Sequence, residues 1–425
     1  MKNKQIFLSI LTVGLALGTA WAIRGRFGHE QGAAWAGAIG AVSLVLVAKR
    51  NDWYNKVFRI ALAAAFGWGI SGVMSYGIIV GYGRGTDFLN VFYGLLMLFV
   101  LGVLYGFLGG GLLGLSLMDS KAVKVKWHAL LTEMVAMGLL TYAVLINQLE
   151  WFMTPPRSEM WAACFGATIA LAWYIARHRY DGVMKVAVGS ALGAGFGFAF
   201  GNFLQVMGSV SGVEFNFWNV MEYSIGFFGG IGMSYGVFTS SWPVSDEKFS
   251  PRSNLIPILW VVLFFPFVVW EQSFVTDRFR FILESGGSES TIFFMKGIAL
   301  LAILSVTIAV IAKNYFSILP KGTVNPAGRV KGFFILYTGL YVFLSFLVTG
   351  VFVHPPEQYL YVLNLVVILF LVPRINGGFE IHENRPGRWT MLSVLLVLVI
   401  AVLAVIAINS HGEMPGSQVR FGNNL

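Results

Sequence analysis

Apolar runs of roughly 16 to 25 residues recur along the whole chain, and short polar connections separate them. A run of this length forms a helix that crosses a hydrocarbon core of about 30 Å, and within lipid a helix satisfies its own backbone hydrogen bonds. The chain has 425 residues, of which 57% are hydrophobic and 12% charged, and its mean hydropathy is +0.73. We therefore expect an all-α polytopic membrane protein, with connections too short to form a soluble domain.

The apolar runs predict about thirteen transmembrane helices. They are expected at residues 5–22, 33–47, 60–80, 88–117, 127–146, 160–175, 183–207, 217–240, 255–274, 292–311, 332–352, 359–372 and 390–408. The first run, with Lys2 and Lys4 before it and Ala20-Trp21-Ala22 at its end, is similar to a cleavable signal peptide. Because the next run follows closely, we expect the first run to be retained as a helix.

The basic residues follow a topological pattern. The net charge is +9, but Lys and Arg are dispersed over short connections and form no stripe, which argues against nucleic acid as a partner. When the N-terminus is placed in the cytoplasm, most of the 29 Lys and Arg fall on cytoplasmic connections, as the positive-inside rule requires. We expect the inner membrane of a bacterium, with the C-terminus in the periplasm.

Two stretches of the chain repeat each other. Trp35-Ala36 and Gly40-Ala41 recur 126 positions later as Trp161-Ala162 and Gly166-Ala167, and residues 106–110 resemble residues 226–230. Four predicted helices separate the copies, so both copies have the same orientation, as in the parallel repeats of many transporters. The sequence thus predicts a first four-helix unit at 1–125, a second at 126–250, and a C-terminal unit of five helices with a short outer tail at 251–425.

Glycines recur at helical spacing within the predicted helices. Gly193, Gly197 and Gly201 lie four residues apart, as do Gly226 and Gly230. Small residues let helix backbones approach in lipid, where no hydrophobic force drives helices together. We expect the helices at 60–80, 88–117, 183–207 and 217–240 to occupy the centre of the bundle. Trp21, Trp151, Trp218 and Trp270 are expected in an aromatic belt at the outer interface.

The densest polar cluster is Arg24-Gly25-Arg26-Phe27-Gly28-His29-Glu30, between the first two helices. Charged groups at membrane depth are costly, so such a cluster is first interpreted as functional. The predicted topology places further polar residues at the same outer level. The predicted substrate-binding residues are Arg24, Arg26, His29, Glu30, Asn202, Gln205, Asn219, Glu222 and Lys296, and the predicted ion-coupling residues are Glu30, Glu222 and Glu271.

These residues need partners of opposite charge. If Gly28 leaves the helix intact, Arg26 and Glu30 are spaced to pair, which leaves Arg24 or Lys296 for a ligand. The fork of an arginine suits a carboxylate or phosphate, so the expected ligand is a small anionic solute or an anionic lipid headgroup. The competing interpretation is structural, because charged side chains near helix ends can reach the interface and pair there.

Motifs for other chemistry are absent from the sequence. His29-Glu30 lacks the spacing of a helical metal site, and no glycine run follows the pattern of a nucleotide-binding loop. We expect neither a metal nor a cofactor, and we identify no catalytic residue. Cys164 is the only cysteine, so no intrachain disulfide is possible.

Three functions fit these observations. The first is a secondary transporter of a small anionic solute, favoured by the repeat, the glycine packing and the short loops. The second is a membrane transferase that acts on an anionic lipid or lipid-linked substrate at the outer leaflet, with His29 or Glu30 as general base. The third is a non-catalytic scaffold whose polar cluster holds helices together. Membrane lipids and the solute are the expected partners, and homo-oligomerisation is left open.

Overall fold

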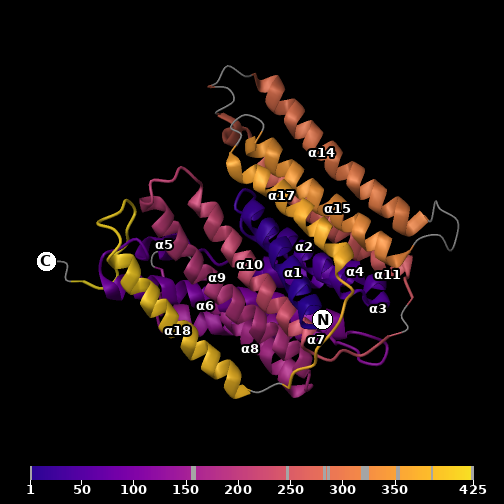
Figure 1. Cartoon of the computed structure of the whole chain (residues 1–425), viewed down its shortest axis with the longest axis horizontal. Helices are drawn as coiled ribbons and strands as arrows, with labels where there is room; N and C mark the ends of the chain where they lie inside the picture. The colour runs from indigo at the N-terminus through magenta and orange to yellow at the C-terminus, as the bar shows by residue number, and fades with distance from the viewer. Residues whose placement is uncertain are drawn as a thin grey trace.

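The computed structural model describes residues 2–154, 159–245, 248–280, 284, 288–316, 325–350, 355–383 and 386–422. All regular structure in this part of the chain is helical (Figure 1). The elements are α1 (Lys2–Arg24), α2 (Glu30–Ala48), α3 (Asn51–Asn55), α4 (Val57–Ser71), α5 (Gly77–Tyr82), α6 (Phe88–Met118), α7 (Trp127–Tyr142), η1 (Ala143–Gln148), α8 (Trp161–Arg177), α9 (Asp181–Val210), α10 (Phe217–Phe238), α11 (Pro251–Ile258), η2 (Leu259–Phe264), α12 (Phe265–Ser273), η3 (Thr276–Phe279), α14 (Glu289–Ile311), η4 (Ala312–Phe316), α15 (Pro326–Ser345), η5 (Phe346–Gly350), α17 (Pro356–Leu371), η6 (Val372–Arg374) and α18 (Pro386–Ile408).

Ten helices among the described residues are long and apolar enough to cross a membrane. They are α1, α2, α6, α7 with η1, α9, α11 with η2 and α12, α14 with η4, α15 with η5, α17 with η6, and α18. The predicted all-helical membrane class is therefore confirmed. Helices are also found at the three remaining predicted positions, as α4 with α5, α8 and α10, whereas thirteen as the number of spans stays a prediction.

The centre of the bundle consists of α1, α2, α4, α6, α9 and α10. Helix α2 is the most enclosed, because every residue from Gln31 to Ala48 is buried. Helix α9 packs against both α6 and α10, and α1 packs against α10 and α2. Figure 1 shows α14, α15 and α17 grouped at one side of this centre and α18 along another. The predicted central helices are indeed there, and α1 and α2 join them.

Glycines form the contacts between these central helices. A Cβ atom at Gly197 of α9 would lie 2.6 Å from the carbonyl oxygen of Ser224 in α10. Likewise, a Cβ atom at Gly67 of α4 would lie 2.5 Å from the carbonyl oxygen of Leu108 in α6. Neither distance leaves room for a side chain, so the glycines hold the backbones in direct contact, as the spacing predicts.

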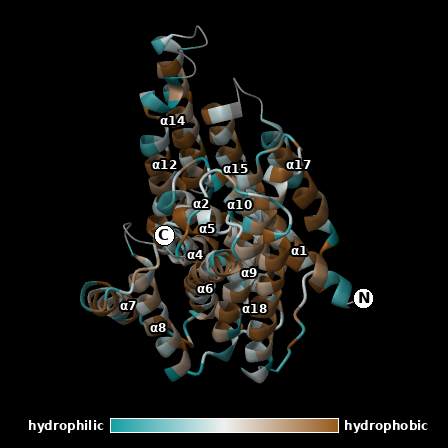
Figure 2. Ribbon diagram, turned by 90° about the vertical axis from the view of Figure 1, so that its left-hand side faces the viewer, coloured by the Kyte–Doolittle hydropathy of each residue, from teal (hydrophilic) through white to brown (hydrophobic). Residues whose placement is uncertain are grey.

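The outer helices expose apolar surface. In α18 the only buried residues are Ile400, Leu403, Ala404 and Ala407, and α14 is also largely exposed. Figure 2 shows hydrophobic residues over the length of these helices and hydrophilic residues mainly near their ends. Such apolar outer faces suit contact with lipid.

One predicted helix is broken. The sequence predicts a continuous helix over residues 60–80, but α4 ends at Ser71 and α5 begins at Gly77. The break follows from close packing, because a Cβ atom at Gly72 would lie 2.5 Å from Cα of Glu30 and 2.6 Å from the carbonyl oxygen of His29. The end of α4 thus packs on the backbone at the start of α2, and the chain turns away from its helical course there.

Candidate functional site

The site is built on the turn between α1 and α2. Arg24 is the last residue of α1, and Glu30 is the first residue of α2. Gly28 between them adopts a φ of +98°, which is costly for residues with a side chain. The polypeptide therefore changes direction at Gly28, and the helical spacing between Arg26 and Glu30 is lost.

Arg24 forms a buried ion pair with Glu222 of α10. Its Nη1 lies 3.1 Å from Oε2 and 3.2 Å from Oε1 of Glu222, and the two residues are only 2% and 7% exposed. Tyr76, in the break between α4 and α5, donates its hydroxyl to Oε1 of Glu222 at 2.5 Å and accepts a hydrogen bond from Arg24. Three elements distant in sequence thus meet at one pair of opposite charges.

Aromatic rings enclose the guanidinium of Arg24. Its central carbon lies 5.3 Å from the ring centroid of Trp21 and 5.5 Å from that of Tyr76, within the range of cation–π attraction. Trp21 is fully buried and packs edge-on against Trp68, with the centroids 5.0 Å apart. The expectation that Trp21 lies in an interfacial belt is therefore wrong, because it forms a wall of the ion-pair site.

His29 connects the buried pair to the accessible surface. Its Nδ1 lies 2.9 Å from Nη2 of Arg24, and because arginine only donates, Nδ1 is the acceptor and carries no proton. The His29 residue itself is exposed. Glu30 beside it is also exposed, and within the described residues its carboxylate has no ion pair. His29 is therefore the exposed side chain in direct contact with the buried Arg24.

The second arginine has a different partner from the one expected. Arg26 pairs with Glu357 of α17, not with Glu30, because the turn at Gly28 separates the i and i+4 positions. Asn216 donates to the same carboxylate at 2.8 Å. Both arginines of the cluster thus have their own carboxylates, so neither stands free for a ligand in this conformation.

Asn219 joins neighbouring helices through hydrogen bonds of its side-chain amide. Its amide nitrogen donates to the carbonyl oxygen of Ala22 at 3.0 Å and to the hydroxyl of Tyr361 at 2.6 Å. These bonds join α10 to the end of α1 and to α17. Asn219 therefore holds the helices that carry Arg24 and Glu222 in register, and it does not face the ion pair.

Gln205 of α9 lines a separate cavity of about 520 Å³, and the fully buried Asn202 lies next to Gln205. Their side-chain amides are 3.1 Å apart. In the amide orientation that satisfies its neighbours, the Gln205 oxygen accepts from Nε1 of Trp218 at 2.9 Å and from Nη2 of Arg84 at 3.2 Å. Glu214 and Asn216 also line this cavity.

Arg84 is the cation of that cavity. Its guanidinium stacks near Trp218, at 5.7 Å from the ring centroid, and donates to the carbonyl oxygen of Pro415 in the C-terminal tail. In the described part of the chain it forms no ion pair with a carboxylate, although Glu214 lines the same cavity. Trp218 lies one helical turn before Glu222, so the cavity and the buried pair share one stretch of α10.

Lys296 and Glu271 lie outside this constellation. Lys296 is in α14, and its Nζ is 3.4 Å from Oγ1 of Thr276. Glu271 is exposed in α12. Its neighbour Gln272 does reach toward the cluster, where it accepts a hydrogen bond from Gln31 at 2.5 Å. The structure thus brings together Arg24, His29 and Glu222 directly, and places Lys296 and Glu271 apart from them.

Sequence reasoning missed three of the residues that shape the site. Tyr76 and Glu357 are isolated polar residues whose neighbours depend on tertiary packing, and Arg84 lies in the short connection between the helices predicted at 60–80 and 88–117. Only the glycines around the α4–α5 break, Gly72 and Gly77, carry a local signal for a helix interruption.

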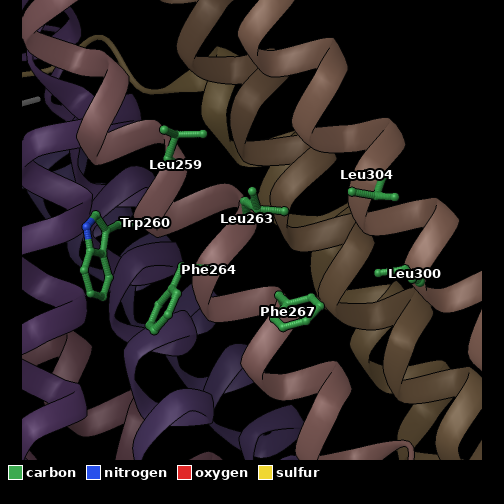
Figure 3. Close-up of a pocket in the computed structure, with 7 residues that line it drawn as sticks. All are labelled: Leu259, Trp260, Leu263, Phe264, Phe267, Leu300 and Leu304. Carbon is green, nitrogen blue, oxygen red and sulfur yellow. The ribbon is translucent and has the colours of Figure 1, made fainter.

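A second apolar cavity, between α12 and α14, offers no polar group for recognition. It is lined by Leu259, Trp260, Leu263, Phe264, Phe267, Leu300 and Leu304. Figure 3 shows Leu263 and Phe267 on the side of the η2–α12 segment nearer Leu300 and Leu304 of α14, whereas Trp260 and Phe264 point to the other side. Such a gap suits hydrocarbon, and it carries no candidate chemistry.

No protein-family model, curated protein or solved structure matches this chain.

Proposed function

We propose that this protein is a secondary transporter that moves a small anionic solute together with a proton across a membrane. The observation that carries the proposal is the buried pair of Arg24 and Glu222, beside the turn between α1 and α2 and the break between α4 and α5. We further propose a bacterial inner membrane as its location, with the N-terminus in the cytoplasm, because that orientation satisfies the positive-inside rule.

The ion pair provides a mechanism for coupling. While Glu222 is ionised it neutralises Arg24, and an anionic solute must compete with it. When Glu222 takes up a proton, Arg24 is left buried with an unpaired positive charge, which is strongly unfavourable. A solute carboxylate or phosphate then restores the balance, so proton and anion bind together. Tyr76 donates to Glu222 and His29 contacts Arg24, which supports the proposal that these two side chains carry the proton.

The helix breaks support a transport site. Within lipid, irregular backbone is tolerated only where protein surrounds it or where it lines a cavity. Residues 72–76 meet the turn at Gly28 through the contact of Gly72 with the start of α2. Interrupted helices of this kind bind substrates and ions in several transporter folds.

The cavity at Arg84 is proposed as the first contact of the solute. Arg84 and the Trp218 ring lie beside the same stretch of α10 as Glu222, and an arginine beside an aromatic ring suits a planar carboxylate.

The contacts between helices support the predicted parallel repeat. The neighbour order α1–α2, α2–α4, α4–α6 recurs as α7–α8, α8–α9, α9–α10.

Uptake into proteoliposomes tests the proposal. Purified protein is reconstituted, an inward proton gradient is imposed, and a panel of radiolabelled mono- and dicarboxylates and inorganic phosphate is tested. We expect wild type to accumulate at least one of these solutes and Arg24→Ala to reduce its uptake about a hundredfold, the effect of losing one partner of a buried charged contact. Asp52→Asn, which removes the carboxylate of the largely buried Arg50–Asp52 pair at the start of α3, is the matched control and keeps normal uptake.

Three outcomes distinguish the functions. Accumulation that depends on Arg24 supports the transporter. Accumulation that is unaffected in Arg24→Ala removes the site. No accumulation of any solute by well-folded wild-type protein contradicts the transporter and favours the scaffold, in which the same pairs only join helices.

A further inference from the structure

A third cavity lies at the opposite end of the bundle from Arg24 and has a different character. It has a volume of about 670 Å³ and is bounded by the first half of α18 together with α1, α9 and α10. The walls come from the N-terminal part of α1 and α9 and the C-terminal part of α10, whereas Arg24 and Glu222 lie at the other ends of α1 and α10. It is therefore independent of the transport site proposed above.

The cavity exists because the first half of α18 packs less closely on the bundle than the second half, although Trp389, Leu392 and Leu396 are partly buried. Its buried residues, Ile400, Leu403, Ala404 and Ala407, all belong to the C-terminal half, which packs on α6 and α9. The N-terminal half stands away from α1 and α10. Figure 1 shows α18 along the edge of the bundle, apart from α1. Gly189 and Gly193 of α9 and Gly232 of α10 line the floor of the groove, where the backbones of the two helices are in direct contact.

The walls of the groove are apolar along its length. Phe7 of α1, Phe196 of α9, Phe228 of α10 and Leu392 and Leu395 of α18 line it. The groove follows α18 through more than one helical turn. This shape matches a hydrocarbon chain better than a compact polar solute.

The mouth of the groove is charged. Lys185 at the start of α9 donates to the carbonyl oxygens of Thr239 and His382, at 2.9 and 3.0 Å, which uses two of its three protons. Arg388 in the first turn of α18 also lines the mouth and is exposed. Within the described residues, neither cation forms an ion pair with a carboxylate, although Glu383 lines the same mouth and has a partner of its own.

We propose that this groove binds an anionic phospholipid, with one acyl chain between α18 and the bundle and the phosphate between Lys185 and Arg388. An apolar shaft that ends in two cations is complementary to an acyl chain that ends in a phosphate. Basic pockets between transmembrane helices recognise anionic headgroups by the same chemistry. The bound lipid would fill the space that separates the first half of α18 from α1 and α10.

Native mass spectrometry of the delipidated full-length protein tests this proposal. The protein is titrated with phosphatidylglycerol and with phosphatidylcholine of the same chains. We expect one phosphatidylglycerol to bind tightly and phosphatidylcholine to bind at least about fivefold more weakly, the effect of roughly one headgroup contact with a cation. Arg388→Ala is expected to lower the affinity for phosphatidylglycerol about fivefold. Arg374→Ala is the matched control, because Arg374 is an exposed arginine at the end of α17 that does not line the groove.

A second variant tests the acyl chain separately from the headgroup. Leu392→Trp places a larger side chain in the groove, so it should reduce binding of phosphatidylglycerol while leaving the helix content unchanged in circular dichroism. Inorganic phosphate at millimolar concentration should not displace the lipid, because it lacks the chain. Equal binding of the two lipids, full displacement by phosphate, or unchanged binding in both variants would each overturn the proposal.

Discussion

The ion pair of Arg24 and Glu222 makes a prediction about stability that depends on burial. Glu222→Ala leaves the Arg24 guanidinium buried without a counter-ion, in a site where Arg24 is only 2% exposed. Breaking a buried pair from one side costs about 3–5 kcal/mol. Tyr76 also loses its acceptor, which adds about 1 kcal/mol. We therefore expect the free energy of unfolding to fall by about 4–6 kcal/mol in Glu222→Ala.

Removing both charges should reverse most of this loss. In Arg24→Met with Glu222→Leu, apolar side chains of similar volume occupy the site and no buried charge is left. Replacing a buried pair in this way is often neutral or stabilising. The double variant is expected within about 1 kcal/mol of wild type, so it should be more stable than Glu222→Ala by at least about 3 kcal/mol.

The assay is unfolding in mixed micelles with increasing SDS, followed by circular dichroism. Arg177→Ala serves as the control, because Arg177 pairs with Glu133 at a half-exposed position where such pairs contribute about 0–1 kcal/mol. If the double variant is as unstable as Glu222→Ala, or if Glu222→Ala is as stable as wild type, the Arg24–Glu222 pair does not behave energetically as a buried ion pair.

Two further predictions follow from packing and from accessibility. Gly72→Ala forces a methyl group against the backbone at the start of α2 and should lower the free energy of unfolding by about 1–3 kcal/mol, whereas Gly339→Ala, which meets open space in α15, should be neutral or slightly stabilising in the same SDS titration. A milder effect at Gly72 than at Gly339 would refute the close contact. In a Cys164→Ala background, His29→Cys should react quickly with a water-soluble maleimide and Ile23→Cys, which is fully buried, should not. Equal labelling of the two cysteines, measured by mass shift, would exclude a polar route along His29.

Much of the fold follows from the sequence because lipid restricts the choices. Each apolar run has to satisfy its backbone internally, so a helix forms wherever a run is long enough. The glycine spacing likewise identifies contacts between helices. Gly197, for example, lets the backbone of α9 pack directly on α10. The hydropathy of residues 60–80 predicts one continuous helix. The glycines Gly72 and Gly77 are the only local signal for the break, which arises from the contact of Gly72 with the start of α2.

The site was predicted in part, and the reason lies in pairing. Arg24, His29 and Glu222 meet in the structure. Charged groups are costly at membrane depth, so the sequence alone indicates that they need partners. Which partner each charge finds depends on tertiary structure. Arg26 reaches Glu357 on a helix more than three hundred residues away, and no local pattern carries that information. Lys296 contacts the hydroxyl of Thr276 and lies outside the cluster.

The most direct test of proton coupling compares two transport assays on Glu222→Gln. Glutamine resembles the protonated carboxyl, so Arg24 stays available to the solute but no proton is exchanged at this position. We expect counterflow of labelled solute at nearly the wild-type rate, together with complete loss of uphill accumulation driven by a pH gradient. Undiminished accumulation in Glu222→Gln would show that the proton does not act at Glu222 and would contradict the central claim.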